Sequence, residues 1–256
     1  MRPPPHPHPL LRKLQSIARL TEGEASAAAA MPIEVRNFNP GEDIIREGDH
    51  PSHSFVLLAG LAATYKVTGP GARQIVAFHV TGDMPDLQSL HLDTTDSAIA
   101  AVARCAIGFV AHEDVREICR LFPGLGAAFW KMTLIEAATF REWIVNVGQR
   151  NAAARLAHLF CEIYTRLNAV GMVQDKECEL SLTQLEIADA TGMTTVHVNR
   201  MLQDLRGDGL IRLKQKKLSI LNWNELARVA DFDPTYLHLR GGRSSPQNGA
   251  TVAARF

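Results

Sequence analysis

The sequence predicts an α+β protein: an N-terminal double-stranded β-helix or jelly roll, a long dimerisation helix and a C-terminal winged helix-turn-helix. Three observations predict this fold. Short β-branched runs separated by Gly, Pro and Asp turns occupy residues 33–110. A helical apolar pattern of roughly 25 residues follows Pro123. Two short helical patterns joined at a glycine, and then a hairpin pattern, lie within residues 183–221.

Length and composition suit a chain of two compact domains with real cores, because 46% of its 256 residues are hydrophobic. No run approaches the roughly 18 apolar residues of a membrane helix, so we expect no membrane association. The first residues lack the apolar core of a secretory signal, which predicts a cytoplasmic protein. The four cysteines form no C-x-x-C pair, so we expect neither a disulfide framework nor a metal site, and no cofactor is predicted.

The formal net charge is zero, but the charges are unevenly distributed. Residues 151–256 carry 13 Lys and Arg against 11 Asp and Glu, and residues 181–222 carry six against four. A modest local excess of this kind can bind phosphates even when the whole chain is neutral.

The expected order of domains follows these patterns. Residues 1–9 and 240–256 are predicted to be disordered tails. Residues 10–122 are predicted to form the β-roll sensor domain with N-terminal helices, residues 123–150 the dimerisation helix and residues 151–239 the DNA-binding domain. Within these we expect a capping box at Thr21 and Glu24, strands at Ser54–Leu58, Ala62–Val67, Gln74–Val80, Ser97–Val102 and Ala106–Val110, a helix at Asn151–Leu167 and a polar connector at Gly171–Glu179.

The long helix carries an apolar stripe at three- and four-residue spacings. A helix of this length between two domains commonly pairs with its twin, so we predict a homodimer. The alternative is that the stripe packs against the sensor domain of the same chain. The residues predicted to make the dimer contact are Leu125, Met132, Ile135 and Thr139.

The most specific pattern begins at Thr183. Thr183 and Glu186 are spaced as a capping box. Ala188 is small where two helices must cross closely, and Gly192 can adopt the positive φ of a tight turn. Thr194 is then placed to cap a second helix that extends to about Arg206.

That second helix has two faces when its residues are placed at 100° intervals. Val198, Met201, Leu202 and Leu205 lie on the core face. Arginine suits guanine and amide side chains suit adenine, so the opposite face is predicted to read bases. The predicted base-reading residues are Thr195, Val196, Asn199, Arg200 and Gln203, and the predicted contacts to the DNA backbone are Thr183, Thr194, His197, Lys214, Lys216 and Lys217.

With these motifs, the chain resembles the Crp/Fnr superfamily of bacterial regulators from about Leu10 to Leu239. Thr183–Leu202 is similar to its helix-turn-helix, and Phe38–Asp49 to the start of its β-roll. The resemblance implies a homodimer that binds double-stranded DNA at a pseudo-palindromic site, with RNA polymerase as a further partner. It places Arg200 at the family's usual base-reading arginine and Val196 where a glutamate is typical. Valine can contact a thymine methyl group but cannot accept from cytosine N4.

The candidate effector pocket departs from the cyclic-nucleotide-binding members. Those members have an arginine for the cyclic phosphate and a glutamate for the ribose, where this chain has Asp96 and Leu87. A carboxylate repels a phosphate, so we predict no binding of cyclic AMP or cyclic GMP and leave the effector, if any, unassigned. No cysteine precedes Cys105 to hold an N-terminal iron–sulfur cluster, and the histidines favour surface roles over haem ligation. The candidate pocket residues are Gly82, Asp83, Asp86, Leu87, Asp96 and Ser97.

Two other classes of function compete with a regulator of transcription. The first is a β-roll regulatory module that docks on a partner protein through its helical C-terminus. The polar face around Arg200 argues against it, because docking surfaces are usually more apolar. The second is an enzyme, which we do not expect, because the sequence has no P-loop, metal triad or nucleophile–base motif.

Overall fold

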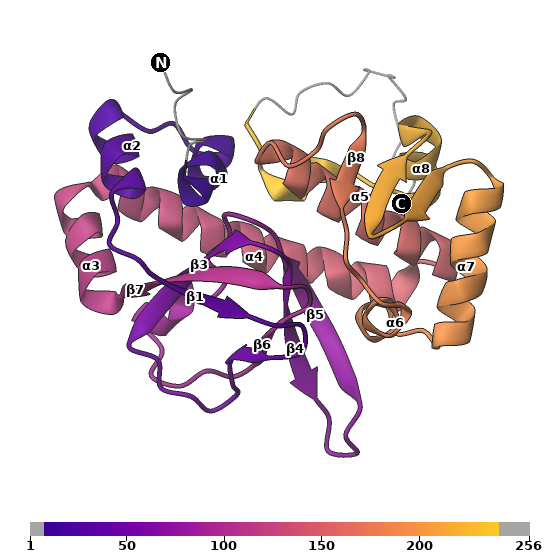
Figure 1. Cartoon of the computed structure of the whole chain (residues 1–256), viewed down its shortest axis with the longest axis horizontal. Helices are drawn as coiled ribbons and strands as arrows, with labels where there is room; N and C mark the ends of the chain where they lie inside the picture. The colour runs from indigo at the N-terminus through magenta and orange to yellow at the C-terminus, as the bar shows by residue number, and fades with distance from the viewer. Residues whose placement is uncertain (1–7, 241–256) are drawn as a thin grey trace, which may run out of the picture.

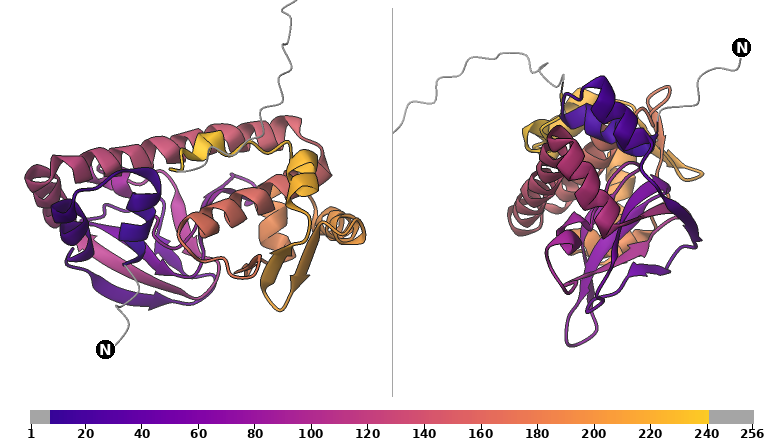
Figure 2. Two further views of the ribbon diagram at one scale, coloured as in Figure 1. Left: turned by 90° about the horizontal axis from the view of Figure 1, so that it is seen from above. Right: turned by 90° about the vertical axis from the view of Figure 1, so that its left-hand side faces the viewer.

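The computed structural model describes residues 8–240, so the predicted tails lie almost wholly outside the described residues. Two short helices and a β-roll form one end of the molecule, and a winged helix-turn-helix forms the other (Figure 1). A single long helix runs along both of them (Figure 2). Across residues 8–240 no helix is both long enough and apolar enough to cross a membrane.

The N-terminal helices pack on the outside of the β-roll. In α1 (Pro9–Ile17), Leu10, Leu14 and Ile17 recur at helical spacing and are almost fully buried. The expected capping box starts α2 (Glu22–Ala29), because Thr21 and Glu24 satisfy each other's backbone N–H groups.

The β-roll is made of two antiparallel sheets. One has the order β1 (Glu34–Phe38), β7 (Cys105–Ala111), β3 (His53–Ala59). The other has the order β2 (Asp43–Ile45), β6 (Ala98–Ala101), β4 (Ala62–Val67), β5 (Arg73–His79). The core contributed by both sheets contains Ile45, Phe55, Leu57, Ala62, Ile99, Ala101, Cys105 and Ile107.

Helices connect the β-roll to the rest of the chain. A short 3₁₀ helix, η1 (Leu87–Leu90), precedes β6, and α3 (His112–Leu121) follows β7. Then α4 (Pro123–Gln149) extends for 27 residues, which confirms the predicted long helix. Pro123 lies in its first turn, where its missing N–H costs nothing.

The C-terminal domain begins with α5 (Ala152–Ala169), which Asn151 caps. The helix-turn-helix is α6 (Gln184–Thr191) and α7 (Thr195–Gly207). The wing is a three-stranded antiparallel sheet in the order β8–β10–β9. Its strands and the remaining elements are β8 (Glu177–Glu179), β9 (Ile211–Lys214), β10 (Lys217–Ile220), α8 (Trp223–Ala230) and η2 (Pro234–Leu237).

The connector predicted to be only polar contains a strand. Glu177–Glu179 pairs with β10, and this pairing places Cys178 opposite Leu218 inside the sheet. The pairing is non-local, so the local composition of residues 171–179 does not reveal it.

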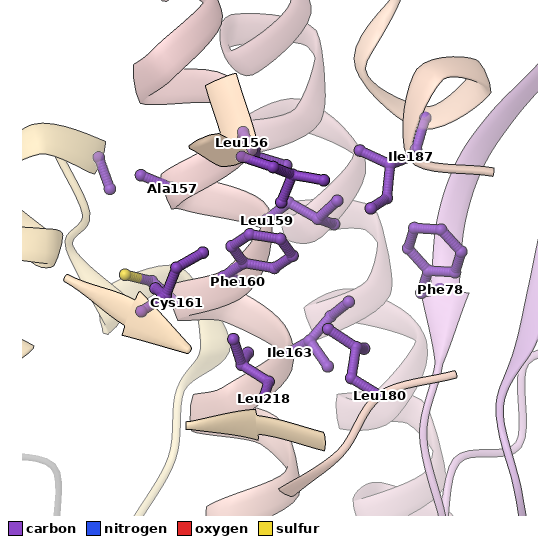
Figure 3. Close-up of a cluster of buried hydrophobic side chains, with 14 of the residues drawn as sticks. Phe78, Leu156, Ala157, Leu159, Phe160, Cys161, Ile163, Leu180, Ile187 and Leu218 are labelled. Atoms are coloured by element: carbon purple, nitrogen blue, oxygen red, sulfur yellow. The ribbon is translucent and has the colours of Figure 1, made fainter. Parts of the chain in front are cut away.

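The two ends of the molecule share one hydrophobic core (Figure 3). Phe78 of β5 packs edge-on against Trp143 of α4, with ring centroids 5.9 Å apart. Residues of α5 complete the core, including Leu159 and Phe160, which are almost fully buried. The helix that precedes the helix-turn-helix therefore packs directly on the sensor domain.

Candidate DNA-reading surface and sensor groove

The turn between α6 and α7 has the geometry that its sequence predicts. Gly192 ends α6 with φ of 64°, in the left-handed region. Its N–H donates to the carbonyl of Ala188, which is buried where the helices meet. Arg155 of α5 stabilises this turn, because its Nη1 donates a hydrogen bond to the Thr191 carbonyl at 3.0 Å.

One side of α7 anchors the helix to the domain. Thr194 caps the helix, accepting from the N–H of His197 at 3.2 Å. Val198, Leu202 and Leu205 are at most 3% exposed and pack into the shared core. This anchoring fixes which side of the helix faces solvent.

The opposite side of α7 is open to solvent along its first three turns. Val196 is 79% exposed, and the rest of this side is polar. An exposed helix with arginine and amide side chains in its N-terminal half is suited to enter the major groove and bond base edges. All five predicted base-reading residues are exposed: Thr195, Val196, Asn199, Arg200 and Gln203.

The wing presents a basic tip. Gln215 and Lys216 take left-handed φ values of 52° and 62°, which close the two-residue turn between β9 and β10. Lys214, Lys216 and Lys217 are all exposed around it. Lysines on a projecting turn can contact phosphates. Arg212, by contrast, pairs with Glu177 at 2.9 Å.

Three of the predicted backbone contacts lie at the two helix N-termini. Thr183 and Thr194 are exposed and act as helix caps, and the hydroxyl of Thr183 donates to Glu186 at 2.8 Å. His197 is half-buried in the first turn of α7. The positive end of a helix dipole attracts phosphate, so these positions suit DNA backbone even where the hydroxyl is already bonded.

The predicted effector residues do not form one pocket. Gly82, Asp83, Asp86 and Leu87 are all buried under α1 and β3. Gly82 has φ of 94°, and a Cβ there would lie 2.7 Å from the Pro9 carbonyl oxygen. This glycine lets α1 approach the chain closely, and its place in an effector pocket stays a prediction.

Asp83 forms ion pairs with residues of both domains. It pairs with Lys13 of α1 and with Arg166 of α5, each at 2.7 Å. Burial would raise the pKa of Asp83, but these two cations outweigh burial and hold the pKa well below its usual range. The carboxylate therefore stays ionised inside the protein.

The ion pairs extend into a network that we call the interdomain charge cluster: Lys13, Asp83, Arg166 and Glu162. Arg166 also pairs with Glu162 at 3.1 Å. Glu162 is fully buried and accepts from Trp143 Nε1 at 3.0 Å and from the Tyr236 hydroxyl at 2.7 Å. The chain between β5 and β6, which contains Asp83, is called the sensor loop. The cluster thus joins the sensor loop to α1, α4, α5 and η2.

Asp86 is buried for a different reason. Its Oδ1 accepts from the N–H of Phe55 at 3.0 Å, and its Oδ2 has no partner among residues 8–240. Burial without a cation raises the pKa of Asp86 to about 8. The side chain therefore supports the turn as a largely neutral acid at pH 7.

Asp96 and Ser97 line an open groove of about 330 Å³ between the β-roll and α4. Lys66 lies beside them, contacting the Asp96 carbonyl oxygen and pairing with Glu47 at 2.9 Å. Sequence reasoning missed three further groups of this groove, Lys66, Gln88 and Glu136, because they come from β4, η1 and α4 and meet only in the fold. Burial raises the pKa of Glu136 to about 8, with a smaller contribution from Asp83.

The predicted dimer residues face inward. Leu125, Met132, Ile135 and Thr139 are at most 7% exposed and pack within the same chain. The side of α4 that carries these four residues therefore packs against the sensor domain of the same chain, and a dimer contact through them stays a prediction. The large apolar side chains that α4 exposes are Trp130, Leu134, Ile144 and Val145.

Several cysteine and histidine side chains are buried in the protein. Burial raises the pKa of Cys178 to about 12 and also raises that of Cys161, so both favour the unreactive thiol. His79 is buried and its Nε2 lies 2.7 Å from Thr64 Oγ1. No group of three or more potential metal ligands occurs within residues 8–240.

Comparison with known proteins agrees with both ends of the molecule. A model of the cyclic nucleotide-binding domain matches residues 35–121, and one of the Crp-like helix-turn-helix domain matches residues 154–229. Electron transport regulator A of Shewanella oneidensis is 26% identical over 74% of this chain and 76% of its own length. The fumarate and nitrate reduction regulatory protein of Vibrio cholerae is 25% identical over 82% of this chain and 84% of its own.

The fold also resembles that of a solved structure. The structure of FixK2 from Bradyrhizobium japonicum matches with a TM-score of 0.69 at 21% identity, covering 77% of this chain and 96% of that one. A β-roll, a connecting helix and a winged helix-turn-helix define the class of two-domain DNA-binding regulators. Within that class, the chain belongs to the Crp/Fnr family.

Proposed function

We propose that the protein is a sequence-specific regulator of transcription that inserts α7 into the major groove of double-stranded DNA. The observation that carries this proposal is the exposed side of α7, with Asn199, Arg200 and Gln203 held outward by a buried opposite side. Membership of the Crp/Fnr family supports it. In this proposal the protein acts in the bacterial cytoplasm, contacts RNA polymerase at its target promoters and catalyses no reaction.

The regulator acts as a homodimer on a pseudo-palindromic site. Support comes from α4, whose exposed Ile144 borders an apolar groove of about 500 Å³ that also includes Val76, Phe140 and Val147. An exposed apolar surface of this kind favours association. A second copy, with its own α4, is the occupant that would give one recognition helix per half-site.

Cyclic AMP is not the effector in this proposal. Asp96 is exposed at the groove, where the cyclic-nucleotide-binding members have a phosphate-binding arginine, and Lys66 beside it is already paired with Glu47. Asp83 is committed to Lys13 and Arg166. Isothermal titration of the full-length protein with cyclic AMP should give no heat of binding, and a micromolar dissociation constant would contradict this part of the proposal.

DNA binding is tested with the full-length protein and an operator selected from a random duplex library. Affinity should fall steeply with salt, because phosphate contacts release counterions. Arg200→Ala should weaken binding by about 1–3 kcal/mol per half-site and relax the sequence preference. Arg120→Ala, which removes an exposed arginine from α3, is the matched control and should leave affinity unchanged. Equal affinity for Arg200→Ala and wild type would refute the assignment of the reading side.

A further inference from the structure

Val196 is the most exposed large hydrophobic side chain within residues 8–240, at 79%. It lies in the first turn of α7, one helical turn before Arg200 and on the same polar side. Valine is a weak helix former because χ1 is restricted by the preceding turn. At this position it therefore adds little either to the core or to the helix, and its isopropyl group remains available for a ligand.

The surroundings of Val196 restrict what that ligand contact can be. The first turn of α7 has no acidic residue. Glu186 of the preceding helix is held at the start of α6, where its Oε2 accepts from the backbone N–H and hydroxyl of Thr183 at 2.7 and 2.8 Å. The first turn of α7 itself thus carries no carboxylate to accept from cytosine N4. The apolar feature that the major groove offers instead is the C5 methyl group of thymine.

We propose that Val196 is a specificity-determining residue that reads a thymine methyl group at a fixed distance from the guanine read by Arg200. Val196 and Arg200 are separated by about 6 Å along the axis of α7, which lies in the major groove in this proposal. Each half-site should therefore contain a thymine within about two base pairs of that guanine. This inference rests on the proposed function and specifies its DNA target.

The contribution of the methyl group can be estimated. Removing one methyl-sized group from water corresponds to about fourfold in affinity. A symmetric dimer makes the contact twice, so losing both should weaken binding about 15-fold.

The test replaces thymine by deoxyuridine, which lacks only the C5 methyl group. The operator is selected with the full-length protein, and each thymine is then replaced in both half-sites together, one position at a time. Wild type should lose about 15-fold in affinity at one position per half-site. Val196→Ala should bind the thymine operator more weakly and show no further loss with deoxyuridine at that position.

Matched variants separate this contact from general weakening. Gln203→Ala lies on the same side of α7 and should keep the deoxyuridine effect, as should Val196→Thr, which retains a methyl group. Val196 is exposed, so circular dichroism of Val196→Ala should match wild type. The inference is overturned if wild type is indifferent to deoxyuridine at every position, or if Val196→Ala keeps the full effect. Failure to select any operator would instead contradict the proposed function.

Discussion

The buried acids of the sensor loop show how neighbouring residues of one type acquire different roles. Asp83 and Asp86 are three positions apart, and both are buried. Two cations keep Asp83 ionised, whereas Asp86 has a single backbone donor and a pKa raised to about 8. The sequence analysis placed both in one candidate effector pocket, because the cations that pair with Asp83 come from α1 and α5, which are distant in the chain.

This difference predicts a pH effect on stability that a comparison of wild type with Asp86→Asn isolates. The folded protein holds the Asp86 proton up to about pH 8, while the unfolded chain releases it near the ordinary pKa of 3.8. The contribution of Asp86 to the free energy of unfolding is therefore fully present below about pH 4 and is lost as pH rises toward 8. In urea titrations at pH 5, 6.5 and 8, wild type should lose stability relative to Asp86→Asn, which cannot ionise.

The control for this series is Asp93→Asn, an exposed carboxylate in the same loop. Its stability should follow that of wild type at all three pH values. Parallel curves for wild type and Asp86→Asn would show that Asp86 is ionised in the folded protein.

At the scale of single elements, much of the structure follows from local signals. Several features that were predicted from the sequence are present, because each depends on residues within one or two helical turns. They are the capping boxes at Thr21 and Thr183, the left-handed conformation of Gly192 and the extent of α7. Strand β8 and the groove residue Lys66 were not predicted, because each is defined by a partner far away in the chain.

The helix α4 illustrates a further limit of prediction from sequence. It is apolar on more than one side, so periodicity alone could not tell which side packs on the sensor domain and which remains exposed. In the structure, Met132 and Ile135 are buried against the sensor domain, whereas Leu134 and Ile144 are exposed to solvent. The proposed dimer contact therefore uses the exposed side chains Leu134 and Ile144.

That surface predicts the effect of a charge on α4. Ile144 is 72% exposed, so Ile144→Glu should leave the fold intact but place a charge in the proposed dimer contact. Sedimentation at micromolar concentration should show a dimer for wild type and a shift toward monomer for Ile144→Glu. Val67→Glu, 52% exposed at the end of β4, is the matched control and should remain dimeric. A dimer of unchanged strength in Ile144→Glu would exclude this side of α4 from the interface.

At the scale of the whole molecule, sensor and DNA-binding domain are not independent units. They share the core around Phe78 and Phe160. Arg73 of β5 also pairs with Asp189 of α6 at 2.8 Å, so the sensor sheet touches the helix-turn-helix itself. A small cavity of about 40 Å³ between the domains is lined by His79, Asp83 and Arg166 among others. A change in the sensor can thus reach α5 and α6 through direct contacts.

Substitutions in the interdomain charge cluster give the most direct test of this coupling between the two domains. Arg166→Met keeps a similar apolar length but leaves the buried carboxylates of Asp83 and Glu162 without their shared cation. Removing one member of a buried ion pair typically costs about 3–5 kcal/mol, because the remaining charge is uncompensated. Chemical denaturation should show a loss of this size. Hydrogen exchange should increase in α5 and in the segment around Tyr236, which bonds Glu162.

Arg120→Met provides the comparison, since Arg120 pairs with Glu117 on the exposed side of α3. Exposed pairs of this kind contribute about 0–1 kcal/mol, so this variant should remain close to wild type. A triple variant should recover part of the stability lost in Arg166→Met; it combines Lys13→Met, Asp83→Leu and Arg166→Met. In it Glu162 keeps its two neutral hydrogen-bond donors, Trp143 and Tyr236, and no other member of the cluster stays charged. If Arg166→Met were no more costly than Arg120→Met, the cluster would not hold the two domains together.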